Sequence, residues 1–411
     1  MNTMPARTLR LALALATAAA AACTPRAPSP TVAGARWVGT WTSSQQLVEP
    51  RNLPPAPGLA GNTLREMIHV SIGGARIRFR FSNTFGDGPL AIASARVARS
   101  LGGGAIDTAT DRPLTFRGAD SVLIPAGAMA WSDPLDYAVV PKADLAVTVA
   151  FGAVPAALTG HPGSRTTSYL KAGRWVTAAS LADGATTDHW YVLANLDVVA
   201  TDSARAIVTL GNSITDGRGS GTNLNDRWPD ELAIRLLSDA PTSRIAMLNA
   251  GIGGTKILEG GLGPTALARL ERDVLDQAGA RWVIVLEGVN DIGGTHGPDS
   301  AAAVATRMIA AFQRIIAAAH ARGLRVYGGT IMPFGGSFYE GPGHEEARQT
   351  VNRWIRGGGT FDAVIDFDAA LRDPAHPDRL LPDADSGDHL HPNEVGYRMM
   401  AGAVDVALFR E

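Results

Sequence analysis

Ser213 is the first residue whose position could support chemistry. It lies within residues 211–217, Gly-Asn-Ser-Ile-Thr-Asp-Gly, just after the apolar run 206–210. A serine on a tight turn between a strand and a helix is exposed and has backbone N–H groups nearby, as a nucleophile requires. The same residues are typical of an ordinary glycine-rich turn or of a loop that binds phosphate. This segment alone leaves all three interpretations open.

Two later loops carry groups that could stabilise an oxyanion. Three glycines, Gly251, Gly253 and Gly254, follow the apolar run 245–248 and allow close backbone approach to a ligand. Asn290 follows the apolar run 282–286, and its amide can donate to a developing oxyanion without adding charge. Each loop taken alone could equally be a flexible connection or a turn.

Asp388 and His391 form the last candidate group. A carboxylate three residues before a histidine can accept from Nδ1, which fixes the tautomer and leaves the other ring nitrogen as a free base. A metal site at His389 and His391 is the alternative, but the neighbouring segments supply no third well-spaced ligand. The spacing therefore favours a general base with its orienting carboxylate.

The elements that position these residues alternate between strands and helices. Strands are expected at residues 206–210, 245–248, 282–286, 324–327 and 363–367, and helices at 230–237, 264–277, 300–322 and 394–409. This alternation predicts a parallel sheet with helices on both faces. Ligands bind such sheets at the carboxyl ends of the strands, which is where the candidate residues lie.

The front half of the chain has a different pattern. Short runs of apolar or alternating residues, separated by Gly and Pro, predict strands at residues 63–70, 75–81, 90–92, 121–124, 145–149 and 190–193. Residues 71–74, Ser-Ile-Gly-Gly, are expected to form a hairpin turn between the first two runs. Many short strands without a long helix predict a β-sandwich, jelly-roll-like in form.

The four segments, in this order, closely resemble the SGNH, or GDSL-type, hydrolase family over residues 203–411. The resemblance implies a flavodoxin-like three-layer hydrolase domain with Ser213 as nucleophile and Asp388 and His391 completing the triad. It implies an oxyanion hole built from Ser213, Gly254 and Asn290. Carboxylic esters would be hydrolysed through an acyl-enzyme, with no metal and no cofactor. Asn212 departs from the family pattern, which has Asp there.

The natural ester is suggested only by the front half and by residues 286–294. Exported family members with an N-terminal β-sandwich resemble acetylesterases that act on xylan, so an acetylated polysaccharide is the expected substrate. A lipase or arylesterase acting on longer acyl chains is one alternative, and an inactive glycan-binding protein is another. Five tryptophans could stack on sugars, although core packing is the favoured role for each: Trp37, Trp41, Trp131, Trp175 and Trp190. His161 and His189 are expected to be structural.

Composition and net charge argue against several classes of partner and of metal site. The chain has 411 residues, 45% of them hydrophobic, and a formal net charge of -2 from 37 basic and 39 acidic side chains. That balance argues against a nucleic-acid partner, which needs clustered excess cations. A single cysteine excludes an internal disulfide framework and any cysteine-rich metal site. Whether the front half binds glycan or calcium stays open.

The pattern of the N-terminal residues predicts an export signal. Residues 1–22 combine Arg7 and Arg10 with a short apolar run, which predicts a signal peptide. Cys23 follows at once, as in a bacterial lipoprotein, although Ala20 stands where leucine is usual. The expectation is a membrane-anchored lipoprotein, with periplasmic or secreted protein after ordinary cleavage as the alternative. A Pro-rich tether at 23–35, a β-sandwich domain at 36–202 and a hydrolase domain at 203–411 would follow.

Overall fold

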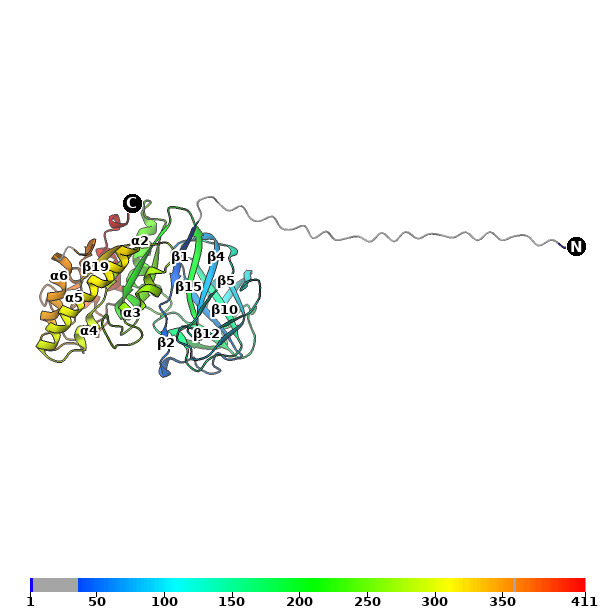
Figure 1. Cartoon of the computed structure of the whole chain (residues 1–411), viewed down its shortest axis with the longest axis horizontal. Helices are drawn as coiled ribbons and strands as arrows, with labels where there is room; N and C mark the ends of the chain where they lie inside the picture. The colour runs from blue at the N-terminus through cyan, green and yellow to red at the C-terminus, as the bar shows by residue number, and fades with distance from the viewer. Residues whose placement is uncertain (3–35, 358–359, 411) are drawn as a thin grey trace. The chain divides into compact units, whose positions relative to one another are not determined.

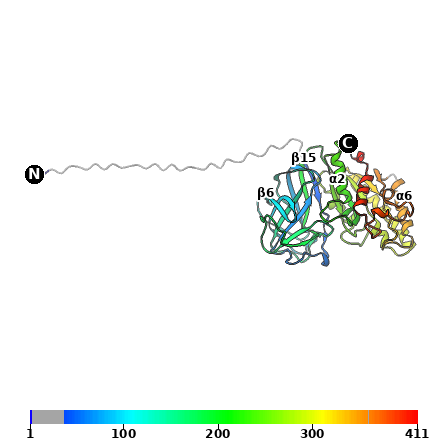
Figure 2. The ribbon, with the colours of Figure 1, turned by 180° about the vertical axis from the view of Figure 1, so that it is seen from behind.

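The computed structural model describes residues 1–2, 36–357 and 360–410. Apart from Met1 and Asn2, the predicted signal peptide, Cys23 and the tether at 23–35 lie outside the described residues. Every element described below lies in the unit Gly34–Glu411. Within that unit a strand-rich region and a helix-rich region adjoin each other, with β6 and α6 at opposite ends (Figures 1 and 2).

The strand-rich region contains three antiparallel sheets. The first is ordered β1 (Arg36–Thr42), β15 (Leu193–Ala200), β4 (Gly74–Ser82) and β8 (Met129–Trp131), with β9 (Leu135–Val139) also on β4. The second is ordered β13 (Ala185–Thr187), β12 (Ser168–Lys171), β3 (Thr63–His69), β10 (Asp144–Phe151), β5 (Leu90–Gly102) and β6 (Ala105–Leu114), with β7 (Val122–Ile124) also on β5. The third is β14 (Trp190–Tyr191), β11 (Thr159–His161) and β2 (Gln46–Leu47).

The predicted hairpin at residues 71–74 is wrong. Strands β3 and β4 do form, but they belong to different sheets and do not pair with each other. The connecting residues Val70, Ser71 and Ile72 are buried, whereas a hairpin turn would be exposed. The Ser71 N–H donates to the Thr40 carbonyl oxygen of β1 at 3.0 Å, so the connection crosses the interior from one sheet to the other.

The alternation of apolar and basic residues in β4 predicts one buried face and one polar face, and the structure confirms it. Ile77, Phe79 and Phe81 are fully buried, whereas the arginines between them lie on the other face. There the Arg78 guanidinium pairs with the Asp197 carboxylate at 2.8 Å and stacks over the Trp131 ring at 4.2 Å. The apolar face therefore builds the core, while the polar face is covered by an ion pair and an aromatic ring.

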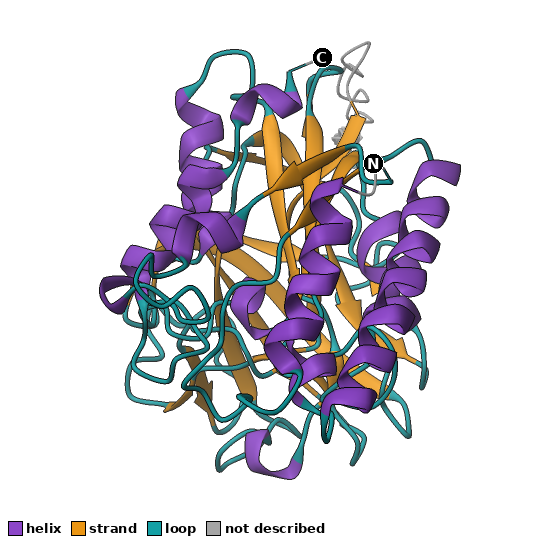
Figure 3. Cartoon of the chain, turned by 90° about the vertical axis from the view of Figure 1, so that its left-hand side faces the viewer, coloured by secondary structure: helices purple, strands orange, loops and turns teal. Residues whose placement is uncertain are grey.

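The helix-rich region is built on one parallel sheet, ordered β17 (Ile245–Gly251), β16 (Arg205–Gly211), β18 (Ala280–Leu286), β19 (Arg325–Gly329) and β20 (Ala363–Ile365). All its pairings are parallel, as the alternation of runs predicts. Its α-helices are α1 (Ser213–Asp216), α2 (Trp228–Ser238), α3 (Ala266–Leu270), α4 (Val289–Gly293), α5 (Pro298–Ala321), α6 (His344–Gly357), α7 (Phe367–Leu371) and α8 (Glu394–Ala403). Figure 3 shows helices lying in front of the strands.

Shorter helical turns complete the described chain: a π-helical turn at Glu271–Leu275, and 3-10 turns at Pro50–Asn52, Pro382–Ala384 and Val406–Phe409. The expected helix at 264–277 is therefore α3 followed by a π turn, and the expected helix at 394–409 ends at Ala403. Helix α5 alone among the described helices has the length and apolar composition to cross a membrane; here it packs against α6 and β19.

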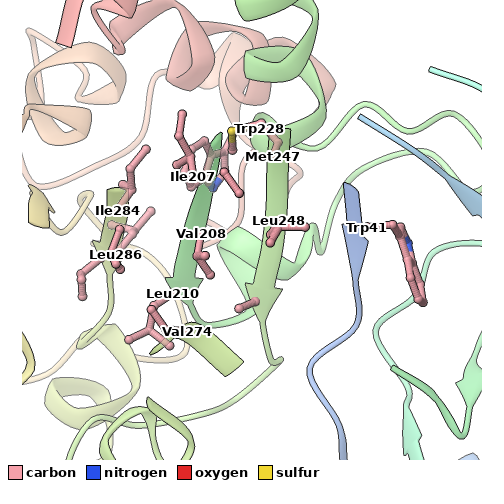
Figure 4. Packing of buried hydrophobic residues seen from close by; sticks show 14 of the residues in the cluster. Trp41, Ile207, Val208, Leu210, Trp228, Met247, Leu248, Val274, Ile284 and Leu286 are labelled. Carbon is pink, nitrogen blue, oxygen red and sulfur yellow. The ribbon is translucent and has the colours of Figure 1, made fainter. Parts of the chain in front are cut away.

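The two regions share one hydrophobic core along β1 and β17. Figure 4 shows Trp41 of β1 on one side of this core and buried residues of β16, β17 and β18, among them Leu248, on the other. Gly39 makes the close approach possible, because a Cβ there would lie 2.9 Å from the Leu248 side chain. Polar contacts also cross the junction, such as the 2.7 Å hydrogen bond from the Asn195 amide to the Gln277 side-chain oxygen.

Candidate active site

Three strands of the parallel sheet end at the same level. Gly211 of β16 lies opposite Gly251 of β17 and Leu286 of β18 in the sheet register. The loops that follow these strands therefore meet at one edge of the sheet. Ser213 begins α1 after β16, and Asn290 lies in α4 after β18. The sheet thus brings together side chains that are 77 positions apart in the sequence.

Ser213, His391 and Asp388 form a continuous hydrogen-bonded chain. The Ser213 Oγ lies 2.8 Å from His391 Nε2, and His391 Nδ1 lies 2.6 Å from an Asp388 carboxylate oxygen. The His391 backbone N–H also donates to the other Asp388 oxygen at 2.9 Å, which fixes the carboxylate beside the ring. Ser213 is only 7% exposed, so it is more enclosed than the exposed serine expected for a tight turn.

The surroundings of the Ser213–His391–Asp388 triad favour a neutral imidazole on His391. Burial lowers the pKa of His391 below its ordinary value, although the hydrogen bond and charge of Asp388 act in the opposite direction. Burial alone would raise the pKa of Asp388, but hydrogen bonds from the His391 backbone and ring outweigh it and lower the pKa to about 2. A carboxylate that is always ionised beside a neutral ring is the state that a general base requires.

A pH profile tests this electrostatic arrangement. We expect the acid limb of kcat/KM for p-nitrophenyl acetate to have its midpoint below 6.5, because the ordinary histidine value of 6.5 is lowered in the folded protein. Protonating Nε2 removes the acceptor for the serine proton, so activity is lost as pH falls through this value. Initial rates at constant ionic strength give the midpoint, and a midpoint above about 7 would contradict the arrangement.

Two groups that could stabilise an oxyanion lie on the loops that follow β17 and β18, at the same edge of the sheet as Ser213. The Asn290 amide donates one N–H to the Thr255 carbonyl oxygen at 2.7 Å, and its oxygen accepts from the Tyr339 hydroxyl at 3.1 Å. These two contacts fix the amide orientation and leave its second N–H as a donor. Gly254 has a φ of +72°, a conformation that glycine adopts without strain. Ser213 itself lies in the first turn of α1, where backbone N–H groups lack intrahelical partners.

Asn212 occupies a buried polar site. Its side-chain oxygen accepts from the Ile214 N–H at 3.1 Å, and its amide donates to a Glu287 carboxyl oxygen at 3.3 Å. Arg269 lies 3.5 Å from the other oxygen of Glu287, and all three side chains are buried. An aspartate at position 212 would place a second carboxyl group against Glu287, whereas the asparagine supplies an N–H donor. Asn212, which stands where the family pattern has an aspartate, therefore suits the polar groups around it.

Burial raises the pKa of Glu287 to about 8, with the Arg269 charge acting against the rise. In an unfolded chain the same carboxyl ionises near 4.5. Between these values the folded protein holds a proton that the unfolded chain has lost, so the free energy of unfolding falls as pH rises.

Glu287→Gln should remove this dependence. We expect the fall in Tm between about pH 5 and pH 8 to be smaller in the variant by at least about 2–4 °C, which corresponds to ~1 kcal/mol. Thermal denaturation at several pH values measures it. Glu259→Gln, at an exposed carboxylate, is the control and should behave as the unchanged protein. An equal fall in the Glu287 variant would disprove the assignment.

Several residues at this edge of the parallel sheet were not predicted from the sequence. Asp291 accepts from the Ile257 and Leu258 N–H groups at 2.9 and 3.1 Å, so it holds the loop that contains Gly254. Its position directly after Asn290 was an available signal. The contacts of Glu287 with Asn212 and of Tyr339 with Asn290 had no local signal, because each joins separate segments of the chain.

The remaining residues that the sequence suggested as metal ligands or sugar-binding groups have other contacts in the structure. His389 pairs with Asp385 at 2.6 Å, whereas His391 is engaged by Asp388 and Ser213, so the two rings do not share a ligand position. No group of three His, Cys, Asp or Glu side chains in the described part of the chain could hold a metal ion. Trp41 and Trp190 are buried and pack edge to face at 5.0 Å.

The three other tryptophans lie beside cations. Arg78 stacks over both Trp37 and Trp131, and Lys171 lies 4.5 Å from the centre of the Trp175 ring. An exposed aromatic residue that the sequence did not single out is Phe338, which is 71% exposed and packs against Tyr339 at 4.4 Å.

The second half of the chain is similar to known proteins. Residues 209–399 match the model of the GDSL-like Lipase/Acylhydrolase family. No curated protein matches the chain. Solved structures that match include a putative lipolytic protein of the G-D-S-L family from Desulfitobacterium hafniense, at 18% identity over 48% of this chain and 96% of that chain, with a TM-score of 0.37.

Two further solved structures are similar over the same half. A lipase/acylhydrolase from Enterococcus faecalis is 20% identical over 48% of this chain and 92% of that chain, with a TM-score of 0.37. A catalytic mutant of an acetylxylan esterase from Geobacillus stearothermophilus is 19% identical over 49% of this chain and 92% of that chain, with a TM-score of 0.37. On the family match, residues 209–399 form a GDSL-like lipase/acylhydrolase domain, a hydrolase that acts on ester bonds.

Proposed function

We propose that the protein is a serine esterase in which Ser213 is the nucleophile, His391 the general base and Asp388 the residue that orients it. The observation that carries this proposal is the continuous chain from Ser213 Oγ through the His391 ring to Asp388, with links of 2.8 and 2.6 Å. A hydroxyl within hydrogen-bond distance of an oriented imidazole is the arrangement that activates serine in acyl transfer.

The reaction has two halves. In the first, Ser213 Oγ attacks the ester carbonyl carbon while its proton passes to His391 Nε2. The tetrahedral intermediate collapses, and the leaving alkoxide takes that proton, which leaves the acyl group on Ser213. In the second, water attacks the acyl carbon and gives a proton to His391 Nε2. Collapse releases the acid, and the proton returns to Ser213. Asp388 stabilises the imidazolium in both halves.

The negative oxygen of each intermediate would be held by three donors: the Ser213 and Gly254 backbone N–H groups and the Asn290 amide. We expect Asn290→Ala to lower kcat about 10²–10³-fold with a much smaller change in KM, as for loss of one oxyanion donor. Tyr339→Phe is the matched control, because it removes only the partner of the Asn290 oxygen and should cost far less. Equal losses in both variants would contradict the assignment.

For the substrate we propose a small acyl group, most simply acetyl, carried by a polysaccharide such as xylan. The exposed Phe338 ring, beside the tyrosine that contacts Asn290, supplies an apolar face of the kind that packs on a sugar ring.

Acetate release tests this substrate class. The purified protein should release acetate from acetylated xylan, and its kcat/KM on p-nitrophenyl esters should fall at least tenfold from acetate to octanoate. Phe338→Ala should raise KM for acetylated xylan without a matching change for p-nitrophenyl acetate. A rise in kcat/KM with chain length, and no acetate from xylan, would favour the lipase or arylesterase alternative.

The finer architecture is also a proposal. We propose that residues 203–411 form a flavodoxin-like three-layer domain and that residues 36–202 form a jelly-roll-like sandwich. The strand order β17-β16-β18-β19-β20 supports the first, because the chain enters at a central strand and then winds both ways. The antiparallel pairing of every strand from β1 to β15 supports the second.

We propose that the protein is exported and anchored to a membrane by lipid on Cys23. Arg7, Arg10, the apolar run that follows and the position of the only cysteine support this. Growth with labelled palmitate should label the protein and leave it in the membrane fraction. Cys23→Ser should abolish both results. An unlabelled protein in the soluble exported fraction would instead favour ordinary signal cleavage.

A further inference from the structure

His161 of β11, in the strand-rich region, reaches into the hydrolase region. Its Nε2 lies 2.9 Å from an Asp216 carboxylate oxygen, and its Nδ1 lies 2.8 Å from the Ser44 carbonyl oxygen. Both His161 and Asp216 are buried. Asp216 is the last residue of α1, the helix that begins with Ser213. The contact therefore joins the strand-rich region to the short helix that carries the proposed nucleophile.

Both ring nitrogens of His161 have a partner. The Ser44 carbonyl oxygen can only accept, so Nδ1 donates to it, while Nε2 faces the Asp216 carboxyl group. A buried polar pair of this kind holds its geometry, because breaking it would leave polar groups without partners away from water.

The second oxygen of Asp216 holds the glycine loop. It accepts from the Gly253 N–H at 3.0 Å, one residue before Gly254, the proposed oxyanion donor. Gly253 is also close to the nucleophile, since a Cβ built on it would lie 4.0 Å from the Ser213 Cβ. One carboxylate thus bridges His161 and the loop that must present its N–H to the oxyanion.

The surroundings of His161 fix the ring in this position. The Trp190 ring stacks on it at 5.8 Å, and Trp41 packs against the edge of Trp190. Gly163, two residues later, lies so close that a Cβ there would be 1.9 Å from Asp216. A substitution at Gly163 would push the carboxylate away, so this loop of the strand-rich region is shaped to meet Asp216.

We propose that His161 is a positioning residue of the esterase, which acts through Asp216 to hold Gly253 and thereby the Gly254 N–H in place. The strand-rich region is then a working part of the active site. This inference rests on the proposed esterase function and on the proposed role of Gly254. It assigns a task in catalysis to a histidine whose sequence context predicts only a structural role.

The test measures turnover per intact active site. A fluorophosphonate probe titrates the competent fraction of wild-type protein, His161→Gln, His161→Phe and Asp216→Asn, and kcat on p-nitrophenyl acetate is divided by that fraction. A purely structural role lowers Tm and the titre but leaves kcat per titrated site unchanged. We expect about a tenfold to hundredfold loss of kcat per site in His161→Phe, with KM within about threefold of wild type, since losing an oxyanion donor outright costs 10²–10³.

The matched control is His189→Phe. His189 lies in the same region, and its Nδ1 donates to the Pro162 carbonyl oxygen at 2.6 Å, but this hydrogen bond stays within that region. It should keep its kcat per site. The inference is overturned if His161→Phe and His161→Gln stay within twofold of wild type, or if His189→Phe shows the same loss. If His161→Phe does not fold, His161→Gln and Asp216→Asn decide the question.

The same experiment separates this inference from the proposed function. If wild-type protein hydrolyses no ester and reacts with no probe, the esterase proposal fails first. If wild-type and His189→Phe proteins are active and the His161 and Asp216 variants equal them per site, only the positioning role fails.

Discussion

Ser213→Ala is expected to lower kcat on p-nitrophenyl acetate by about 10⁴-fold or more, while KM changes by less than about threefold. The hydroxyl is the atom that forms the acyl-enzyme, so its removal abolishes both half-reactions and leaves only what binding and the oxyanion donors contribute. Its contact with His391 at 2.8 Å is lost, but the serine side chain is small and its removal leaves little void. Steady-state kinetics and a thermal melt together measure the effect.

Ser238→Ala supplies the comparison, because Ser238 lies on the exposed side of α2 and its hydroxyl bonds only to its own helix. It should retain wild-type turnover. A Ser213 variant that keeps more than about a tenth of the wild-type rate, after exclusion of contaminating wild-type enzyme, would show that another group is the nucleophile. His391→Ala should match Ser213→Ala, because the two residues act as one unit.

The second large effect is expected from Asp388→Asn. An asparagine keeps the size of the side chain but can present an amide N–H to His391 Nδ1, which stabilises the wrong tautomer and removes the base. We expect kcat to fall by about 10⁴-fold near neutral pH, as when the carboxylate of such a triad is replaced by its amide. The short contact of 2.6 Å between the carboxylate and the ring is the reason for a large effect.

The chain offers a control with the same spacing. Asp373 and His376 are also three residues apart and pair at 3.1 Å, but this pair lies on the surface and His376 contacts no serine. Asp373→Asn should leave turnover unchanged. If Asp388→Asn lost less than about tenfold, Asp388 would be a loop-stabilising residue only, through its bonds to the Leu390 and His391 N–H groups.

The parallel sheet could be predicted from the sequence because its strands are continuous apolar runs. Residues 206–210 and 282–286 are buried on both faces of β16 and β18, so their composition alone indicates their environment. Strands that end at one sheet edge bring their following loops together, and this is why Ser213 and Asn290 could be proposed as neighbours before any coordinates.

Helix α6 was not among the predicted elements, although its pattern indicates a helix. His344–Gly357 is rich in charged residues, but Ala347, Val351 and Ile355 recur every four residues and are buried on one face. A buried arginine also stabilises the helix, because Arg348 pairs with Asp368 at 2.6 Å. That pair joins α6 to α7, and local periodicity carries no information about a partner 20 residues away.

The pairing of β3 and β4 failed for a related reason. Residues 71–74 have the composition of a turn, but the buried connection between the two sheets is determined by contacts with β1. His161 and Asp216 are 55 positions apart, and their contact depends on how the strand-rich region packs on the hydrolase region. Contacts between distant segments are the part of the site that one sequence does not reveal.

The most direct test of the central claim is to locate the acyl-enzyme. A fluorophosphonate probe forms a stable adduct with an activated serine, and peptide mass spectrometry identifies the residue that carries it. The account predicts one adduct per chain, on Ser213, with loss of esterase activity in proportion to labelling and no adduct in Ser213→Ala. Esterase activity that survives complete labelling of Ser213, or an adduct on a different residue, would contradict it.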